Sequence, residues 1–338
     1  MQLRRRSSFL LYSACLFLLL ALILGACGTA NGGTTDAGSG QTLKNVSIGL
    51  GYIPDIQFAP FYVAQTKGYY KAAGLNVTFH HGVEPDLFGS MVAGKDSFVF
   101  ASGDEELVAR SKNLPVIDVS TIFQLYPVSL IVPTNSPIKT LADLKGHTIG
   151  EPGPFGATHT GLLALLYQAH LSLSDVHMQE IGFTQVAALL AHRVDAVMGY
   201  SNNEPLQLRQ QGFAVRTFDV SNYQPLVSNG IITTEATFHN QPQMVRSFVQ
   251  ATIAGLKYVI SHPADAVQIS SAYISGMDSK KAMAVLQSTI PVWEGNGQVA
   301  LGYNNTVTWQ AMEQFLAAEK IIPPVQDLSQ AYTNASVS

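Results

Sequence analysis

Residues 46–79 read VSIGLGYIPDIQFAPFYVAQTKGYYKAAGLNVTF. This stretch begins and ends with short apolar runs rich in β-branched residues, at 46–50 and 77–79. Between them, Phe58, Phe61 and Tyr62 are spaced by three and four residues, which places them on one face of a helix. A strand, a helix and a second strand in this order form a βαβ unit, so we expect an α/β fold with helices on both faces of its sheets.

The same alternation continues to about residue 233, and the last hundred residues are mainly helical. Runs typical of strands are separated there by helical patterns with recognisable starts. The expected strands cover 46–50, 77–79, 98–101, 116–123, 128–132, 148–150, 178–181, 196–198, 215–218 and 230–233, and the expected C-terminal helices cover 242–261, 263–274, 279–289 and 307–319.

Two clusters of turn-forming residues indicate that the chain is divided into two lobes. Proline, asparagine and serine cluster at 133–137, and Ser-Asn-Gly at 228–230 forms the second cluster. If the chain crosses between lobes near both clusters, one lobe consists of 43–132 plus 233–338 and the other of 133–232. Two lobes joined by a double crossing form a hinge that can close on a ligand.

The first 42 residues differ from the rest in composition. Arginines at 4–6 precede an apolar run at 9–25, as in a secretory signal peptide. Residues 24–27, Leu-Gly-Ala-Cys, resemble the bacterial lipobox, and the following residues are mainly small or polar, as in a flexible tether. We therefore expect a signal peptide at 1–26 and a lipidated Cys27 with a flexible linker at 27–42, and an uncleaved membrane anchor is the alternative.

Charge and cysteine content exclude several classes of protein. The chain has 19 Lys and Arg against 23 Asp and Glu, and removal of 1–26 leaves 16 basic residues and a formal net charge of −7. This balance excludes a protein that binds nucleic acid through its phosphates. Both cysteines, Cys15 and Cys27, precede the folded part, which therefore has no thiol for a disulfide, a metal or a nucleophile.

Common active-site motifs are also absent from the sequence. It has no P-loop, nucleophile elbow, zinc-protease or calcium-loop pattern, and Gly49-Leu50-Gly51 lacks the third glycine of a dinucleotide fingerprint. His80 and His81 are adjacent on an expected strand, so they point to opposite faces and cannot easily share a metal. We therefore expect no metal, no cofactor and no catalytic residue.

Loops rich in aromatic and amide side chains follow several of the expected strands instead. Turn formation and helix cores explain each loop singly, but open α/β sheets bind ligands at the carboxyl ends of their strands. The shared placement therefore favours a binding cleft that is formed by these loops. They cover 52–58, 102–105, 124–126, 152–158 and 200–204.

The charge of these loops favours a neutral, flat ligand. Together with 224–229 they contain no Lys or Arg, whereas sulfonate, nitrate or phosphate groups usually recruit cationic side chains or oriented amides. The loop at 153–158 still offers amides to an oxygen atom. The acidic residues of the loops are Asp55, Asp104, Glu105 and Glu204, and the aromatic residues that could stack on a heteroaromatic ring are Phe58, Tyr126, Phe155 and Tyr200.

Residues 51–77, GYIPDIQFAPFYVAQTKGYYKAAGLNV, resemble the opening of ABC-transporter substrate-binding proteins of the thiamine-pyrimidine-precursor (NMT1/THI5-like) family. The resemblance covers nearly the whole mature chain. It implies the type II periplasmic-binding-protein fold, with two α/β lobes joined by a double-crossing hinge. Further matching segments are 138–146 (IKTLADLKG), 193–196 (RVDA), 203–205 (NEP) and 241–251 (QPQMVRSFVQA).

One motif departs from the pyrimidine-binding members of this family. Many of them have Pro-Asn-Thr-x-His where this chain has Pro-Asp-Ile-Gln-Phe at 54–58, so Phe58 stands where the usual histidine would be. This form, with 153–157 (GPFGA), 181–185 (IGFTQ) and 226–230 (LVSNG), is more similar to the riboflavin-binding branch. The cleft residues implied by the resemblance are Asp55, Gln57, Phe58, Asp104, Gln124, Tyr126, Phe155, Gly156, Tyr200, Asn203 and Glu204.

The residues and the resemblance together predict a lipid-anchored, extracytoplasmic receptor. It would capture a neutral heteroaromatic vitamin, with riboflavin preferred, and deliver it to a membrane permease and its ATPase. A receptor for a formylated aminopyrimidine, a thiamine precursor, is the alternative. A pyrimidine synthase of the fungal type is a second alternative, but that enzyme depends on a histidine and a cysteine-rich segment, and this chain has Phe58 and no cysteine after Cys27.

Overall fold

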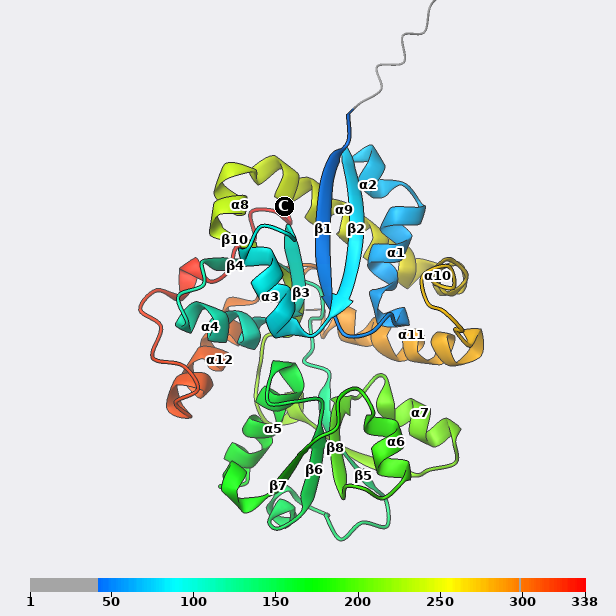
Figure 1. Cartoon of the computed structure of the whole chain (residues 1–338), viewed down its shortest axis with the longest axis vertical. Helices are drawn as coiled ribbons and strands as arrows, with labels where there is room; N and C mark the ends of the chain where they lie inside the picture. Colours follow the sequence, from blue (N-terminus) through cyan, green and yellow to red (C-terminus); the bar gives the residue numbers. More distant parts are fainter. Residues whose placement is uncertain (1–41, 298) are drawn as a thin grey trace, which may run out of the picture. The chain divides into compact units, whose positions relative to one another are not determined.

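Two five-stranded mixed sheets form the framework of the computed structural model, which describes residues 42–297 and 299–338 (Figure 1). Both sheets belong to one compact unit, Gln41–Ser338. We call the first sheet with its helices lobe 1 and the second sheet with its helices lobe 2. The first sheet has the order β2 (Leu75–Gly82), β1 (Lys44–Gly51), β3 (Phe98–Ser102), β10 (Asn229–Thr234) and β4 (Val116–Thr121), and the second β7 (His177–Glu180), β6 (Thr148–Glu151), β8 (Ala196–Tyr200), β5 (Val128–Pro133) and β9 (Val215–Asp219).

Helices cover both faces of each sheet. In lobe 1, Phe98 and Phe100 of β3 pack against α1 and α9, whereas Val99 and Ala101 pack against α3 and α4, because successive strand residues point to opposite faces. The helices of lobe 1 are α1 (Ala59–Thr66), α2 (Tyr69–Ala72), α3 (Glu84–Val92), α4 (Gly103–Ser111), α8 (Glu235–Asn240), α9 (Pro242–Ser261), α10 (Pro263–Ser270), α11 (Ser279–Glu294) and α12 (Thr306–Ala318), and those of lobe 2 are α5 (Gly156–Gln168), α6 (Gln185–Leu190) and α7 (Glu204–Gln210).

The chain crosses between the lobes at 122–127 and 223–228, so the boundaries expected from the sequence are wrong by several residues. Strand β5, which the range 43–132 assigned to lobe 1, pairs with β8 and β9 of lobe 2. Strand β10, which the range 133–232 assigned mainly to lobe 2, pairs with β3 and β4 of lobe 1. Both strands are antiparallel to partners distant in sequence, so the turn residues beside them do not reveal which sheet they join.

On one side of the molecule, an apolar core is shared by both lobes. It contains Leu107 of α4 and Trp309 of α12 from lobe 1, together with Val128 of β5 and Leu162 of α5 from lobe 2. Tyr126, in the first crossing, is buried in the same core, and its hydroxyl donates to the Ala157 carbonyl at 2.7 Å. The lobes are therefore joined here by packing as well as by the two crossing segments.

Lobe 1 also buries two carboxyl groups next to each other, Glu106 on α4 and Asp118 on β4. Both residues are fully buried, and both Glu106 carboxyl oxygens and Asp118 Oδ2 have no hydrogen-bond donor among the described residues. Burial raises the pKa of Asp118 to about 7, and burial together with nearby Asp118 raises the pKa of Glu106 well above its ordinary value. At least one of the two groups is therefore expected to keep its proton at neutral pH.

This buried pair predicts a loss of stability as pH rises from the acidic range through neutrality. The folded pKa values are raised, so stability falls as pH rises from about 4, where the unfolded carboxyls ionise, through about 7, where Asp118 ionises in the folded protein. We expect Glu106→Gln to weaken this dependence and to be more stable than the wild type at pH 8 by at least about 1.4 kcal/mol, the equivalent of one pKa unit. Denaturant unfolding at pH 5 and pH 8 measures the effect, with exposed Glu180→Gln as the control. A Glu106→Gln protein that is less stable than the wild type at pH 8 contradicts this account.

None of the helices within 42–297 and 299–338 has the length and hydropathy needed to span a membrane. The expected signal peptide, Cys27 and all but the last residue of the expected linker lie outside the described residues.

Candidate functional site

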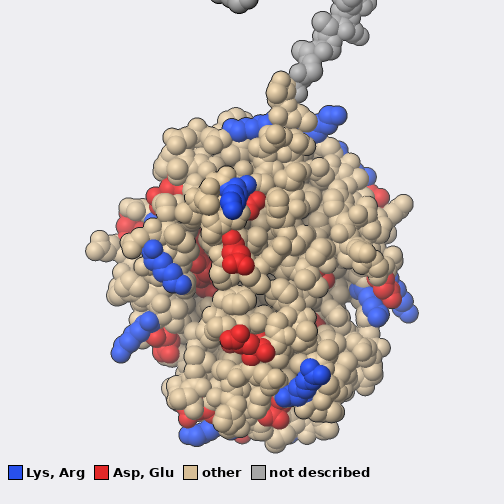
Figure 2. Space-filling model, in the orientation of Figure 1, with Lys and Arg blue, Asp and Glu red and all other residues tan. Residues whose placement is uncertain are grey.

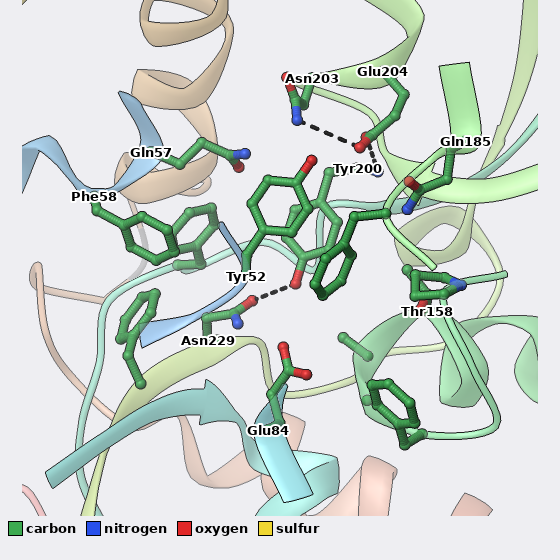
Figure 3. A pocket seen from close by; sticks show the side chains of 18 residues that line it. Tyr52, Gln57, Phe58, Glu84, Thr158, Gln185, Tyr200, Asn203, Glu204 and Asn229 are labelled. Carbon is green, nitrogen blue, oxygen red and sulfur yellow. Dashed lines mark hydrogen bonds between the residues drawn. The ribbon is translucent and has the colours of Figure 1, made fainter. Parts of the chain in front are cut away.

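A cavity lies between the two lobes, beside the carboxyl ends of β1, β6 and β8 (Figure 3). It encloses about 640 Å³ of empty space, including the part that is open to solvent. Lobe 1 and the first crossing contribute Gly51, Tyr52, Gln57, Phe58, Glu84, Phe100, Phe123 and Asn229, and lobe 2 contributes Pro152, Phe155, Gly156, Ala157, Thr158, Phe183, Gln185, Tyr200, Asn203 and Glu204.

Tyr52, directly after β1, has a backbone conformation that is rare for a residue with a side chain. Its φ is 122°, a region that favours glycine. The conformation is held because the Tyr52 amide donates to the Gly82 carbonyl at 2.9 Å and His81 Nδ1 lies 3.2 Å from the Tyr52 carbonyl oxygen. The Tyr52 ring meets Phe183 of lobe 2 edge to face, with 4.8 Å between ring centroids. Strained residues of this kind concentrate at functional sites, and this one places an aromatic ring across the cavity.

Three phenylalanines form an apolar wall on the lobe 1 side. Phe58 lies at the start of α1, and its ring packs edge to face against Phe100 of β3, at 6.1 Å between centroids. Phe123 follows β4, and its ring centroid lies 6.0 Å from that of Phe100. The three rings also belong to the core of lobe 1, so their positions are fixed before any ligand enters.

Hydrogen bonds cross the cleft and hold the lobes together at the cavity. Asn202 of lobe 2 donates to Gln57 Oε1 and to Thr289 Oγ1 of lobe 1, each at 2.8 Å. The Tyr200 hydroxyl donates to Asn229 Oδ1 at 3.0 Å, again from lobe 2 to lobe 1 (Figure 3). The structure therefore represents a closed arrangement, in which polar side chains from both lobes meet around the cavity.

The two polar ends of the cavity each carry a carboxyl group. Glu204, the first residue of α7, accepts a hydrogen bond from the Tyr200 amide at 2.7 Å, and burial raises its pKa to about 7. Glu84, the first residue of α3, lies at the other end (Figure 3), and burial with nearby Asp104 raises its pKa to about 7. The residues that line the cavity include no Lys, Arg or His. On the face seen in Figure 2, acidic side chains lie on both sides of the hollow between the lobes, and Lys and Arg lie farther out.

Two further carboxyl groups, Asp104 and Glu105, lie beside Glu84 at the start of α4. Ser102 caps this helix, and its amide and hydroxyl both donate to Glu105 Oε2, at 3.0 and 2.8 Å. Asp104 is fully buried, and its Oδ1 accepts from the Tyr126 hydroxyl at 3.2 Å. Burial is the main cause that raises the pKa of both carboxyls.

Seven of the eleven residues expected at the cleft line this cavity, and four do not. Asp55 instead accepts from the Gln57 amide at 3.0 Å and caps the short helix before α1. Gln124 donates to two backbone carbonyls, those of Thr121 and Tyr303. Asp104 and Tyr126 are buried and are not among the residues that line the cavity. The seven lining residues are Gln57, Phe58, Phe155, Gly156, Tyr200, Asn203 and Glu204.

The structure adds lining residues that were not among those candidates. Phe183 and Gln185 follow the carboxyl end of β7, and Glu84 follows that of β2, so the rule that pointed to the other loops also applies to them. Asn229 begins the antiparallel strand β10, whose amino end lies beside the carboxyl ends of its neighbours. The remaining additions are Gly51, Tyr52, Phe100, Phe123, Pro152, Ala157 and Thr158.

Comparison with known proteins identifies similar chains. The chain is 37% identical over 336 residues to "Riboflavin-binding protein RibY" of Chloroflexus aurantiacus, covering 95% of this chain and 96% of that protein. It is 26% identical to the "Formylaminopyrimidine-binding protein" of Halalkalibacterium halodurans, covering 75% and 78% of the two chains. Among solved structures, the periplasmic aliphatic sulphonate binding protein SsuA of Escherichia coli superposes with a TM-score of 0.70 at 15% identity, covering 87% and 99% of the two chains.

These similarities agree with the architecture described above. The likeness to SsuA confirms the two-lobed periplasmic-binding-protein fold that the sequence predicted. The family model "NMT1/THI5 like" matches residues 55–266, which include most of both lobes and most of the cavity lining. This chain therefore belongs to the NMT1/THI5-like family.

Proposed function

We propose that this protein is an extracytoplasmic receptor that binds riboflavin and delivers it to the permease and ATPase of an ABC importer, and that it is not an enzyme. The observation that carries the proposal is the cavity between the lobes, which has aromatic rings from both lobes and no cationic side chain among its lining residues. Riboflavin is uncharged at neutral pH and combines a flat ring system with a chain of hydroxyl groups. The 37% identity to the riboflavin-binding protein of C. aurantiacus supports the same ligand class.

The two kinds of lining side chain match the two parts of this ligand. Tyr52, Phe183 and Tyr200 offer ring contacts, each worth about 0.5–1.5 kcal/mol beyond the burial of apolar area. Gln57, Gln185 and the carboxyls at both ends offer donors and acceptors to ring heteroatoms and hydroxyl groups.

Riboflavin binding is tested directly with the full chain purified in detergent. We expect saturable quenching of riboflavin fluorescence with one ligand per chain, and a rise in melting temperature that increases with riboflavin concentration. A protein that neither quenches riboflavin nor is stabilised by it contradicts the ligand assignment. A formylated aminopyrimidine is the second ligand to test, because the chain is 26% identical to the formylaminopyrimidine-binding protein. Stabilisation by this compound and not by riboflavin would identify it as the ligand instead.

We also infer that the receptor is held at the outer face of the cell membrane by a lipid on Cys27. The residues that support this are the arginines at 4–6, the apolar run at 9–25 and the small residues before Cys27. Cell fractionation tests the location, and the wild type is expected in the membrane fraction. The mass of the purified protein tests the lipid, and Cys27→Ser is expected to lack the mass that the lipid adds.

A further inference from the structure

Two glycines, Gly51 and Gly156, lie close to the Glu84 carboxyl in the cavity. A Cβ on Gly51 would lie 2.5 Å from Glu84 Oε1, so the carboxyl occupies space that only a glycine leaves free. A Cβ on Gly156, the first residue of α5, would lie 3.7 Å from Glu84 Oε2 and 3.5 Å from Glu105 Oε1. Two carboxyls of lobe 1 therefore lie against the start of a lobe 2 helix.

The start of α5 would otherwise suit an anion. Helix α5 has 13 residues, and the free amides and dipole of such a helix favour negative charge at its N-terminus. Here the carboxyls of Glu84 and Glu105 lie at this helix start, and burial raises the pKa of both, so this corner resists negative charge instead of attracting it. Behind them, fully buried Asp104 has its Oδ2 without a donor at hydrogen-bonding distance, so this corner already holds more acceptors than donors.

We propose that the carboxyl cluster of Glu84, Asp104 and Glu105 makes the receptor reject phosphate esters of its ligand, with Glu84 as the specificity-determining residue. The inference rests on the proposed function, because the ester in question is flavin mononucleotide, the phosphate ester of the terminal hydroxyl of riboflavin. A phosphate monoester carries a charge of about −1.5 to −2 at pH 7.

The rejection does not depend on which way the ligand lies in the cavity. With its hydroxyl chain toward α5, the phosphate meets the carboxyl cluster. With the ligand reversed, the phosphate meets Glu204, which is buried and already accepts a hydrogen bond from the Tyr200 amide. The cavity lining has no Lys, Arg or His at either end to compensate the added charge.

The experiment compares riboflavin, flavin mononucleotide and a neutral ester of the same terminal hydroxyl, by calorimetry with the full chain at pH 7.5. We expect riboflavin to bind at least about 100-fold more tightly than the phosphate ester. The affinity of the neutral ester is expected to differ much less from that of riboflavin. Glu84→Gln is expected to narrow the ratio of the riboflavin and phosphate-ester affinities by about tenfold, because the pKa of Glu84 is raised only to about 7 and the carboxyl is mostly ionised at pH 7.5. Asp86→Asn removes the same charge from an exposed position on α3 and is expected to leave the ratio unchanged.

The outcomes separate this inference from the proposed function. If riboflavin binds and the phosphate ester binds equally well, the specificity inference is wrong and the proposed function stands. If the neutral ester is rejected as strongly as the phosphate, or if Glu84→Gln leaves the affinity ratio unchanged in a folded protein, size rather than charge excludes the ester and the inference is overturned. If riboflavin does not bind, the proposed function fails, and the specificity inference fails with it.

Discussion

Tyr52→Gly is expected to weaken riboflavin binding by about 30- to 100-fold without lowering the stability of the protein. The affinity falls because the variant removes an aromatic ring from the cavity, a loss of about 2–3 kcal/mol when ring contacts and apolar burial are combined. Stability does not fall because Tyr52 has a φ of 122°, which glycine adopts without strain. Relief of such strain is worth about 1–3 kcal/mol, which offsets the lost contact with Phe183.

Tyr52→Ala is the matched control for this prediction. It removes the same ring but keeps a Cβ, so it is expected to lose similar affinity and to be less stable than Tyr52→Gly. Fluorescence titration measures the affinity, and denaturant unfolding without ligand measures the stability. Equal stability of the two variants would contradict the strain argument, and unchanged affinity in both would remove Tyr52 from the binding site.

Trp309→Ala is expected to cost about 3–5 kcal/mol of unfolding free energy, as removal of a large core side chain usually does. The Trp309 ring is fully buried in the core that both lobes share, and it stacks on Tyr332 with 4.9 Å between centroids. Its Nε1 donates to Asn304 Oδ1 at 2.8 Å, so truncation also deprives a buried amide of a donor. A Cβ on Gly103 would lie 3.0 Å from this ring, so the ring also supports the start of α4 next to the carboxyl cluster.

Val307→Ala provides the control on the same helix, because Val307 is 73% exposed and its truncation should change stability by less than about 0.5 kcal/mol. Chemical denaturation of both variants measures the difference. A loss below about 1 kcal/mol for Trp309→Ala would show that the shared core tolerates a cavity at this point.

Much of the secondary structure could be predicted from local patterns. Each expected strand corresponds to an observed strand, and α9 covers Pro242–Ser261, the range expected from the sequence. Helix α11 extends to Glu294 rather than ending at 289, because the chain continues helically through Pro291. The lobe boundaries were wrong because strand pairing over long sequence distances decides them, and β5 and β10 carry no local sign of their partners.

The site was partly predictable for a related reason. Loops that follow parallel strands were found by a general rule, and Tyr200, Asn203 and Glu204 come from such a loop. Asn229 escaped that rule because β10 runs in the opposite direction. Asp55 and Gln124 have the chemistry of ligand-binding groups, but their side chains make hydrogen bonds to the backbone of the protein itself, which composition alone does not reveal.

The uneven joining of the two lobes has a consequence for how the empty receptor behaves. On one side the lobes share an apolar core around Trp309, whereas at the cavity they meet through the Asn202 hydrogen bonds and the Tyr52–Phe183 ring pair. Water can replace the hydrogen bonds at little net cost, but it cannot replace apolar packing. Opening should therefore pivot about the shared core, and a small free-energy difference should leave the unliganded protein exchanging between open and closed forms.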